Sequence, residues 1–294
     1  MKKTILSTVA LLTAAFSIQA VYHEPYSKSR VYWDMSTKRI SIPQGNYSRM
    51  IELPDGRLLM TAGNKKGIAA VYSSDGGDTW TTPRIFISNT DEYTFGSAEF
   101  LLLDDGTLLM TENSRPVRPF THDRPYHVNV YRSSDFGETW SAPVRIFTQP
   151  TENFRGVWEP ILIQLPSGEI QCYYSSEVPA DNTQEIDMSR SFDNGLTWEP
   201  FERMCYRQGH RDGMPVPIIT NNNDIVFTIE DNGQPGYSGF RATTIRTTLE
   251  NNWHDGWVNA TSSRREKCLT NADDLQYLSA GPYLRKLPGD ETIV

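Results

Sequence analysis

Cysteine and histidine are scarce in this sequence, and the shortage excludes whole classes of site. The 294 residues contain 3 cysteines and 5 histidines. Cys172, Cys205 and Cys268 form no C-x-x-C pair, and no histidine stands at a zinc-ligand spacing from them. The sequence therefore predicts no metal site and no cofactor, and it allows at most one disulfide.

Long apolar stretches are also missing, because after residue 20 no apolar run is long enough to span a bilayer. At the N-terminus, Lys2 and Lys3 precede a mostly apolar run over residues 5–16, and a small residue, Ala20, follows shortly after. That order is typical of a secretory signal peptide. We expect residues 1–20 to be a signal peptide, residues 21–294 to form one domain, and the protein to be secreted or periplasmic.

Basic residues are outnumbered by acidic ones. Lys and Arg total 28 against 36 Asp and Glu, which gives a formal net charge of −8. A negative surface repels phosphate backbones and anionic lipid headgroups. Nucleic acids and membranes are therefore not expected as partners.

Helix signals are nearly absent, and an eight-residue pattern takes their place. The pattern S-x-D-x-G-x-T-W occurs at residues 73–80, 133–140 and 191–198. Its Asp carboxylate can accept hydrogen bonds from the backbone N–H groups that follow and close a turn, and its Gly can adopt φ > 0. The Trp can fill apolar space beneath the turn. Three copies at near-equal spacing indicate a structural repeat.

A tight hairpin precedes each copy and recurs twice more. Its four residues stand between apolar runs at 53–56, 103–106, 165–168, 220–223 and 287–290. Each unit then reads as strand A, hairpin, strand B, loop, strand C, Asp-type turn and strand D. Four antiparallel strands that recur about every 60 residues predict an all-β fold, a β-propeller of four-stranded blades.

The repeats do not fill a whole number of blades. The fourth unit has a degenerate turn at 251–259, and the fifth unit stops within its strand B at Val294. Six blades of this length need roughly 340 residues. We expect about 4.5 blades of a six-bladed propeller, in a domain that is incomplete at its C-terminus.

Alignment of the five hairpins gathers polar residues at one end of the ring. Strands A and B are antiparallel, so the start of strand A and the end of strand B lie at the same rim. Two carboxylates from neighbouring units would suit glycoside cleavage, one as acid and the other as nucleophile or base. The residues expected at this rim are Arg49, Glu99, Asn113, Glu159, Glu230 and Tyr283.

Four further residues flank the same rim and are expected to contact substrate. Trp158 precedes the unit-three glutamate, and it could either stack on a sugar ring or pack between blades. Arg115 follows the end of strand B in unit two. Arg211 and Asp212 stand at the entry to strand A of unit four, where either could face the pocket.

These features resemble the sialidase superfamily, whose six-bladed propellers carry Asp boxes of this form. Within it the chain looks more like the exo-α-1,5-arabinanases of glycoside hydrolase family 93. The resemblance implies a retaining enzyme that acts on plant arabinan and uses two glutamates, which would fall on Glu159 and Glu230. It rests on Y-S-R at 47–49, N-S-R-P at 113–116, V-W-E-P at 157–160, G-M-P at 213–215 with I-E at 229–230, and S-A-G-P-Y at 279–283.

The surroundings of the two glutamates favour a division of roles. The apolar neighbours of Glu159 in the sequence should raise its pKa. We therefore expect Glu159 to be the acid/base, and Glu230 to be the nucleophile, kept ionised by Arg49 or Arg211.

Two other functions remain open, and each has a saccharide partner. A sialidase would share the propeller, although Arg49 is followed by Met50 and Ile51 where sialidases show an F-R-I-P start. A non-catalytic carbohydrate-binding propeller would keep the fold without hydrolysis. In all three cases the expected partner is an oligo- or polysaccharide.

Overall fold

The computed structural model describes residues 36, 38, 40–121, 123–149, 155–178, 183–269, 279–287 and 292–294. The chain divides into two compact units, Met1–Ser41 and Ile42–Val294, and every strand that the structure describes belongs to the second. The expected signal peptide lies outside the described residues. Within the part that the structure describes, no helix is both long and apolar enough to cross a membrane.

Four antiparallel sheets of four strands make up most of the second unit. The first contains β1 (Asn46–Glu52), β2 (Leu58–Asn64), β3 (Gly67–Ser73) and β4 (Arg84–Ser88). The second contains β5 (Tyr93–Leu102), β6 (Leu108–Pro116), β7 (His127–Ser133) and β8 (Val144–Thr148). The third contains β9 (Val157–Gln164), β10 (Ile170–Ser176), β11 (Glu185–Ser191) and β12 (Glu202–Cys205). The fourth contains β13 (Asp212–Ile219), β14 (Asp224–Asp231), β15 (Arg241–Thr248) and β16 (Arg265–Lys267).

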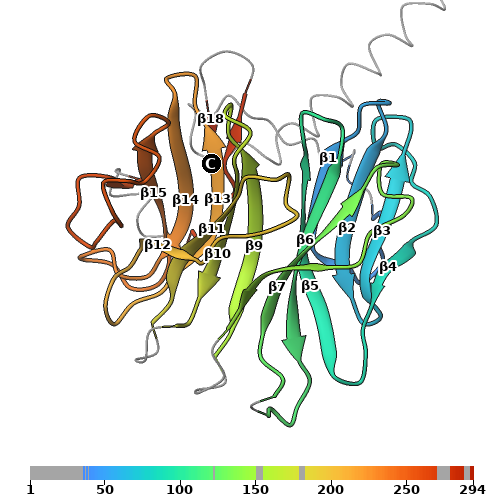
Figure 1. The fold of residues 1–294 in the computed structure, drawn as a ribbon, viewed down its shortest axis with the longest axis horizontal. Coiled ribbons are helices and arrows are strands. Elements are labelled where there is room, and N and C mark those ends of the chain that lie inside the picture. The colour runs from blue at the N-terminus through green and yellow to red at the C-terminus, as the bar shows by residue number, and fades with distance from the viewer. Residues whose placement is uncertain are drawn as a thin grey trace, which may run out of the picture. The chain divides into compact units, whose positions relative to one another are not determined.

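Each sheet is one blade of a propeller, as the repeats predict. Strands pair in chain order within a sheet, and the first strands β1, β5, β9 and β13 pack on one another in turn. Figure 1 shows the four blades following one another from blue to orange. A two-stranded sheet of β17 (Arg285–Lys286) and β18 (Thr292–Ile293) follows them. It flanks the fifth predicted hairpin, of which only Leu287 is described.

The three Asp motifs close turns between the third and fourth strands of their blades. In the second blade, Asp135 Oδ1 accepts hydrogen bonds from Thr139 N at 2.9 Å and Ser133 Oγ at 2.7 Å. Asp135 Oδ2 accepts from Thr139 Oγ1 at 2.5 Å. These bonds favour the carboxylate and lower the pKa of Asp135 to about 2. Asp75 and Asp193 make the same contacts, so the motif is a self-contained turn.

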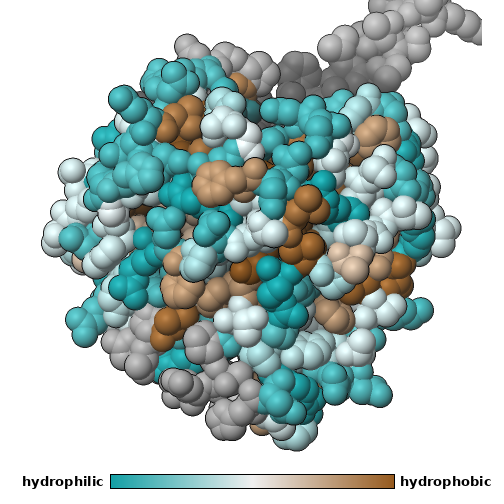
Figure 2. Space-filling model, in the orientation of Figure 1, coloured by the Kyte–Doolittle hydropathy of each residue, from teal (hydrophilic) through white to brown (hydrophobic). Residues whose placement is uncertain are grey.

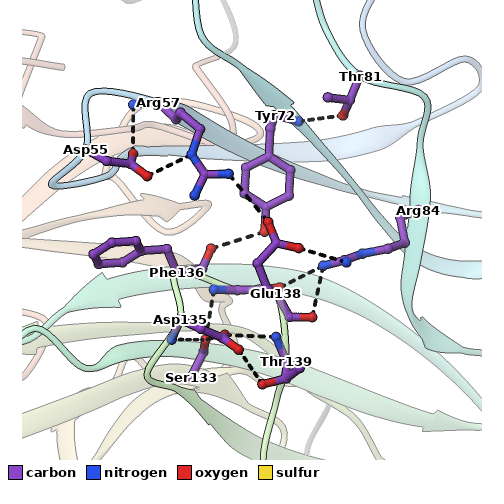
Figure 3. A network of polar contacts seen from close by, with 11 residues as sticks. Asp55, Arg57, Tyr72, Thr81, Arg84, Ser133, Asp135, Phe136, Glu138 and Thr139 are labelled. Atoms are coloured by element: carbon purple, nitrogen blue, oxygen red, sulfur yellow. Dashed lines mark hydrogen bonds and ion pairs between the residues drawn. The ribbon is translucent and has the colours of Figure 1, made fainter.

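The turn of the second blade also fastens that blade to the first (Figure 3). The Tyr72 hydroxyl donates to the carbonyl of Phe136 at 3.1 Å. Glu138 forms ion pairs with Arg57 at 3.4 Å and Arg84 at 3.1 Å. The motif therefore has a structural role, as expected from its place on the outer strands.

The fourth blade also has a turn after its third strand, but this turn is stabilised by different residues. Its turn places Asn252 and Trp253 at φ of 46° and 71°. Trp253 is 3 % exposed, and its indole Nε1 donates to the Tyr173 hydroxyl at 2.9 Å. This tryptophan packs with Phe227 in the core between the third and fourth blades. A tryptophan thus fills the space beneath the turn without an Asp box.

No disulfide forms, although the sequence allowed one. Cys172 and Cys205 are buried, Cys268 is half-buried, and all three thiols are free.

In the face seen in Figure 2, apolar side chains form several groups among polar ones.

Candidate active site

The first strand of every complete blade is interrupted at the same position. Pairing with the second strand shifts by one residue there, which is a β-bulge. The bulged residue has a positive φ each time: Tyr47 (52°), Ser97 (51°), Glu159 (50°) and Met214 (53°). Gly281, at φ of 64°, occupies the aligned position in the fifth unit. The bulge interrupts the alternation of side chains that a regular strand would show.

Glu159 stands at the bulge of β9, in a largely buried setting. Ser175 Oγ donates to Glu159 Oε2 at 3.2 Å and accepts from the backbone N–H of Met214 at 2.9 Å. Burial raises the pKa of Glu159 to about 7, and the negative charge of Glu230 adds to the rise. The Ser175 hydrogen bond and the charge of Arg115 oppose it. Glu159 can therefore hold or release a proton near neutral pH.

Glu230 lies near the end of β14, in the neighbouring blade. Its Oε2 accepts a hydrogen bond from the backbone N–H of Gly281 at 3.0 Å. Burial raises the pKa of Glu230, while the Gly281 bond and the charge of Arg211 lower it. Gly213 faces Glu230 across β13 and β14, and a Cβ on Gly213 would lie 3.0 Å from Glu230 Oε1. The two glutamates thus sit close enough to interact electrostatically, with different partners.

Arg49, Glu99 and Tyr283 form one cluster drawn from two blades and the fifth unit. Arg49 Nε lies 2.7 Å from Glu99 Oε2, and Tyr283 donates its hydroxyl to the same oxygen at 3.1 Å. The Arg49 guanidinium lies over the rings of Tyr47 at 4.0 Å and Tyr283 at 4.6 Å. Burial raises the pKa of Tyr47 and the charge of Glu159 adds to the rise, so this cluster borders the glutamate site. Arg49 therefore pairs with Glu99, and the cation that lowers the pKa of Glu230 is Arg211.

Arg115 and Trp158 lie together beside Glu159. Arg115 Nη2 donates to Ser97 Oγ at 2.9 Å and Asn113 Oδ1 at 3.1 Å. The guanidinium lies 5.2 Å over the Trp158 ring. Asn113 is fully buried and donates its amide to the carbonyl of Val157 at 2.8 Å. Asn113 is predicted to contact substrate, and in the structure both ends of its amide hold Arg115 and β9.

Asp212, another predicted substrate contact, is held by an internal ion pair. Asp212 is fully buried, and its two oxygens accept from Arg265 at 3.0 and 2.5 Å. Arg265 also pairs with the buried Asp231 at 2.8 Å. Asp212 belongs to this internal ion-pair group, whereas its neighbour Arg211 pairs with Glu177 and its charge acts on Glu230.

Sequence reasoning missed four contributors to the site. Tyr47, Ser175 and Gly281 stand at the same distances from their hairpins as predicted site residues do. Their roles depend on the bulge and on backbone donors, which the sequence alone does not show. Glu177 is the ninth residue after its hairpin, as Arg115 is after its own. Side chains two residues apart on a strand lie on the same face, so Glu177 could have been predicted from Ser175 as Arg115 was from Asn113.

The site as built can perform acid/base and nucleophilic chemistry with carboxylates. Among the described residues, no group of three or more His, Cys, Asp or Glu could hold a metal ion. A separate cavity of about 480 Å³ lies at the Asp-box contact of Figure 3, where Arg57, Tyr72, Arg84 and Glu138 line it. None of the predicted site residues lines that cavity, and its charged groups already pair with one another.

Fold and site together define a β-propeller that carries a pair of carboxylates from neighbouring blades. Among solved structures, the chain is similar to the family 93 α-L-arabinofuranosidase of Fusarium graminearum in complex with arabinobiose. That likeness has 22 % identity and a TM-score of 0.62, and it covers 78 % of this chain and 67 % of that one. A Penicillium chrysogenum α-L-arabinanase complexed with arabinobiose is 23 % identical with a TM-score of 0.56, covering 70 % and 63 %. An α-L-arabinofuranosidase from Lactobacillus brevis is 9 % identical with a TM-score of 0.57, covering 84 % and 81 %.

At these identities the likeness confirms the propeller fold. The chain covers 67 % of the Fusarium family 93 enzyme and 63 % of the Penicillium arabinanase, which is about two thirds of the length of each. No family model and no curated protein sequence matches it.

Proposed function

We propose that this protein is a secreted, exo-acting glycoside hydrolase that cleaves arabinan with retention of anomeric configuration. The observation that carries the proposal is the glutamate pair, placed on neighbouring blades and held in unequal surroundings. Its support from outside the chain is the fold, which is shared with enzymes named as arabinofuranosidase and arabinanase, two of them in complex with arabinobiose. Secretion rests on the N-terminal signal pattern alone.

Each glutamate has one role in the proposed mechanism. The Glu230 carboxylate attacks the anomeric carbon, while Glu159 donates its proton to the departing glycosidic oxygen. The bond to the leaving sugar breaks and an ester to Glu230 forms. Glu159, now ionised, then takes a proton from water, and the resulting hydroxide displaces Glu230 from the sugar. Arg211 and the Gly281 N–H favour the ionised nucleophile, and burial favours the protonated acid.

The test is hydrolysis of linear α-1,5-arabinan and arabinobiose, followed by sugar analysis and by NMR of the first anomer released. Wild-type protein should release arabinose with retained configuration. E159A should lose most activity but recover part of it with azide or with a substrate that has a good leaving group, because neither needs an acid. E230Q should lose the covalent step for every substrate. E199Q, which changes an exposed glutamate, is the matched control.

Three results would overturn the proposal. Unchanged hydrolysis in both E159A and E230Q would show that the site is elsewhere. Arabino-oligosaccharide binding without cleavage would favour the non-catalytic propeller. Release of sialic acid from a sialoside would favour a sialidase.

A further inference from the structure

Glu177, which follows β10, joins three parts of the site through one carboxylate. Its Oε2 accepts from the backbone N–H of Gly156 at 2.9 Å. Its Oε1 accepts from Trp158 Nε1 at 3.2 Å and from Arg211 Nη2 at 2.8 Å. The side chain is only 18 % exposed, so these bonds are shielded from bulk water.

Glu177 is connected to the surroundings of Glu159 through Trp158. The Trp158 indole is fixed by Glu177 at its N–H, and Tyr126 meets its ring at a centroid distance of 5.2 Å. Arg115 lies over the same ring, and its charge lowers the pKa of Glu159. A displaced indole would therefore remove one of the contacts that position Arg115, beside its hydrogen bonds to Ser97 and Asn113.

Glu177 is connected to the surroundings of Glu230 through Arg211. Arg211 donates to Glu177 and also to Gln184, and its charge lowers the pKa of Glu230. Without Glu177, Arg211 would keep only the neutral amide of Gln184 as a side-chain partner among these contacts. A guanidinium held by a carboxylate has a more fixed position than one held by an amide alone.

The backbone at Gly156 shows how closely this arrangement is packed. A Cβ on Gly156 would lie 2.1 Å from the Trp158 ring, so the indole rests directly on the glycine backbone. The Gly156 N–H is bound to Glu177, and its carbonyl accepts from Glu177 N at 3.1 Å. The indole is thus located both by contact with Gly156 and by the hydrogen bond to Glu177.

We propose that Glu177 is a positioning residue that holds Trp158 and Arg211, and through them places one arginine beside each glutamate. This inference rests on the proposed function, since it assigns Glu177 to the same site. A carboxylate suits the role because it accepts all three N–H groups, one of them charged. A glutamine of the same shape would turn a donating NH₂ towards one or two of those donors.

The first experiment compares E177Q, E177A and the exposed control E199Q in hydrolysis of arabino-oligosaccharides. Displacing groups that position reactants can cost on the order of 10²-fold. We expect kcat/KM to fall by about 10–100-fold in E177A and by less in E177Q, with E199Q like wild type. The melting temperature of E177Q should stay within a few degrees of wild type. Because E177Q is isosteric, it carries the test if E177A does not fold.

A double-mutant cycle then separates positioning from general structural support. If Glu177 acts through Trp158, E177A combined with W158F should cost much less than the sum of the two single effects. Additive losses would overturn the proposal. So would kinetics of E177Q that match those of E199Q.

A spectroscopic readout tests the contact without any activity. The Trp158 indole ¹H–¹⁵N resonance can be assigned by its absence in W158F. In E177A this resonance should shift and its proton should exchange faster with solvent, with no such change in E199Q. An unchanged resonance would overturn the proposal about Glu177, whereas a shifted resonance in a protein that hydrolyses no arabinan would count against the proposed function alone.

Discussion

At the scale of single residues, two chemically identical side chains differ because their neighbours differ. Glu159 is surrounded by buried groups and meets the charge of Glu230, which together raise its pKa to about 7. Glu230 receives a backbone N–H from Gly281 and faces the charge of Arg211, which both limit the rise of its pKa. The pair therefore offers one carboxyl group that can donate a proton near neutral pH and a second whose ionised form has two stabilising partners.

The pH dependence of catalysis follows from this difference. If Glu159 is the acid, kcat/KM should fall as pH rises through about 7, because the ionised form cannot protonate the leaving group. Measurement of kcat/KM between pH 4 and 9 checks this, and the alkaline fall should disappear in E159A assayed with an activated substrate. A wild-type profile that stays flat to pH 9 would contradict the role of Glu159.

The sequence predicts both glutamates at one rim, but it does not show how Asn113 and Asp212 beside them are held. Glu159 and Glu230 could be found because hairpin alignment fixes which positions meet at the rim. Asn113 and Asp212 occupy the same rim, yet each is buried by a partner from a distant part of the chain: Val157 for Asn113 and Arg265 for Asp212. A column of aligned positions carries no information about such partners.

At the scale of elements, the blades show that one structural task can be met by two sets of side chains. Three turns use an Asp box, and the fourth uses a buried tryptophan whose indole N–H is bound by Tyr173. The Asp boxes could be predicted because their hydrogen bonds are local, within four residues. The Trp253 contact spans 80 residues, so only the tertiary structure could show it.

Tyr173→Phe tests how much this contact contributes. The Tyr173 hydroxyl accepts from Trp253 and donates to Gln171 Oε1 at 2.5 Å, and all three groups are in the interior. Removing it leaves a buried donor and a buried acceptor unpaired, which should lower the free energy of unfolding by about 1–3 kcal/mol. Urea denaturation measures the change. Tyr72→Phe, which loses one part-buried bond to a carbonyl, should cost less; equal losses would contradict the argument.

At the scale of the whole molecule, two sets of carboxyl groups oppose each other as pH changes. The Asp-box residues Asp75, Asp135 and Asp193 have pKa values lowered to about 2 by hydrogen bonds. Their stabilisation is present above their unfolded pKa and is lost as pH falls through 2. Burial raises the pKa of Glu112 and Glu159 to about 7. The contribution of these two glutamates to the free energy of unfolding is most favourable below their unfolded pKa. It is lost as pH rises through 7.

The unfolding free energy should therefore pass through a maximum near pH 4–5, by proton linkage. Denaturation at pH values from 2 to 8 checks this. Glu112→Gln removes a fully buried titrating group while keeping its shape. The fall in stability between pH 5 and 8 should become shallower in that variant, and an unchanged slope would show that Glu112 does not titrate in this range.

A second prediction at this scale concerns the ion pairs that cross the fourth blade. Arg265 is 4 % exposed and joins Asp212 to Asp231, both fully buried. Arg265→Met would leave two buried carboxylates without this partner and should cost about 3–5 kcal/mol. Arg246→Met removes a surface pair with Glu266, where both side chains are about half exposed, and should cost no more than about 1 kcal/mol. Similar unfolding midpoints for the two variants would contradict the difference.

The repeated bulge has a consequence for how such a site can change. Tyr, Ser, Glu, Met and Gly occupy five equivalent positions, each with a positive φ between 50° and 64°. The backbone there already accepts the cost of a left-handed residue, on the order of 1–2 kcal/mol for a residue with a Cβ. Four of the five positions therefore already carry different side chains on the same left-handed backbone. A substitution at one of these positions changes the side chain at the site but leaves the bulge of its strand in place. The chemistry of the site can therefore diverge while the fold of the blades stays the same.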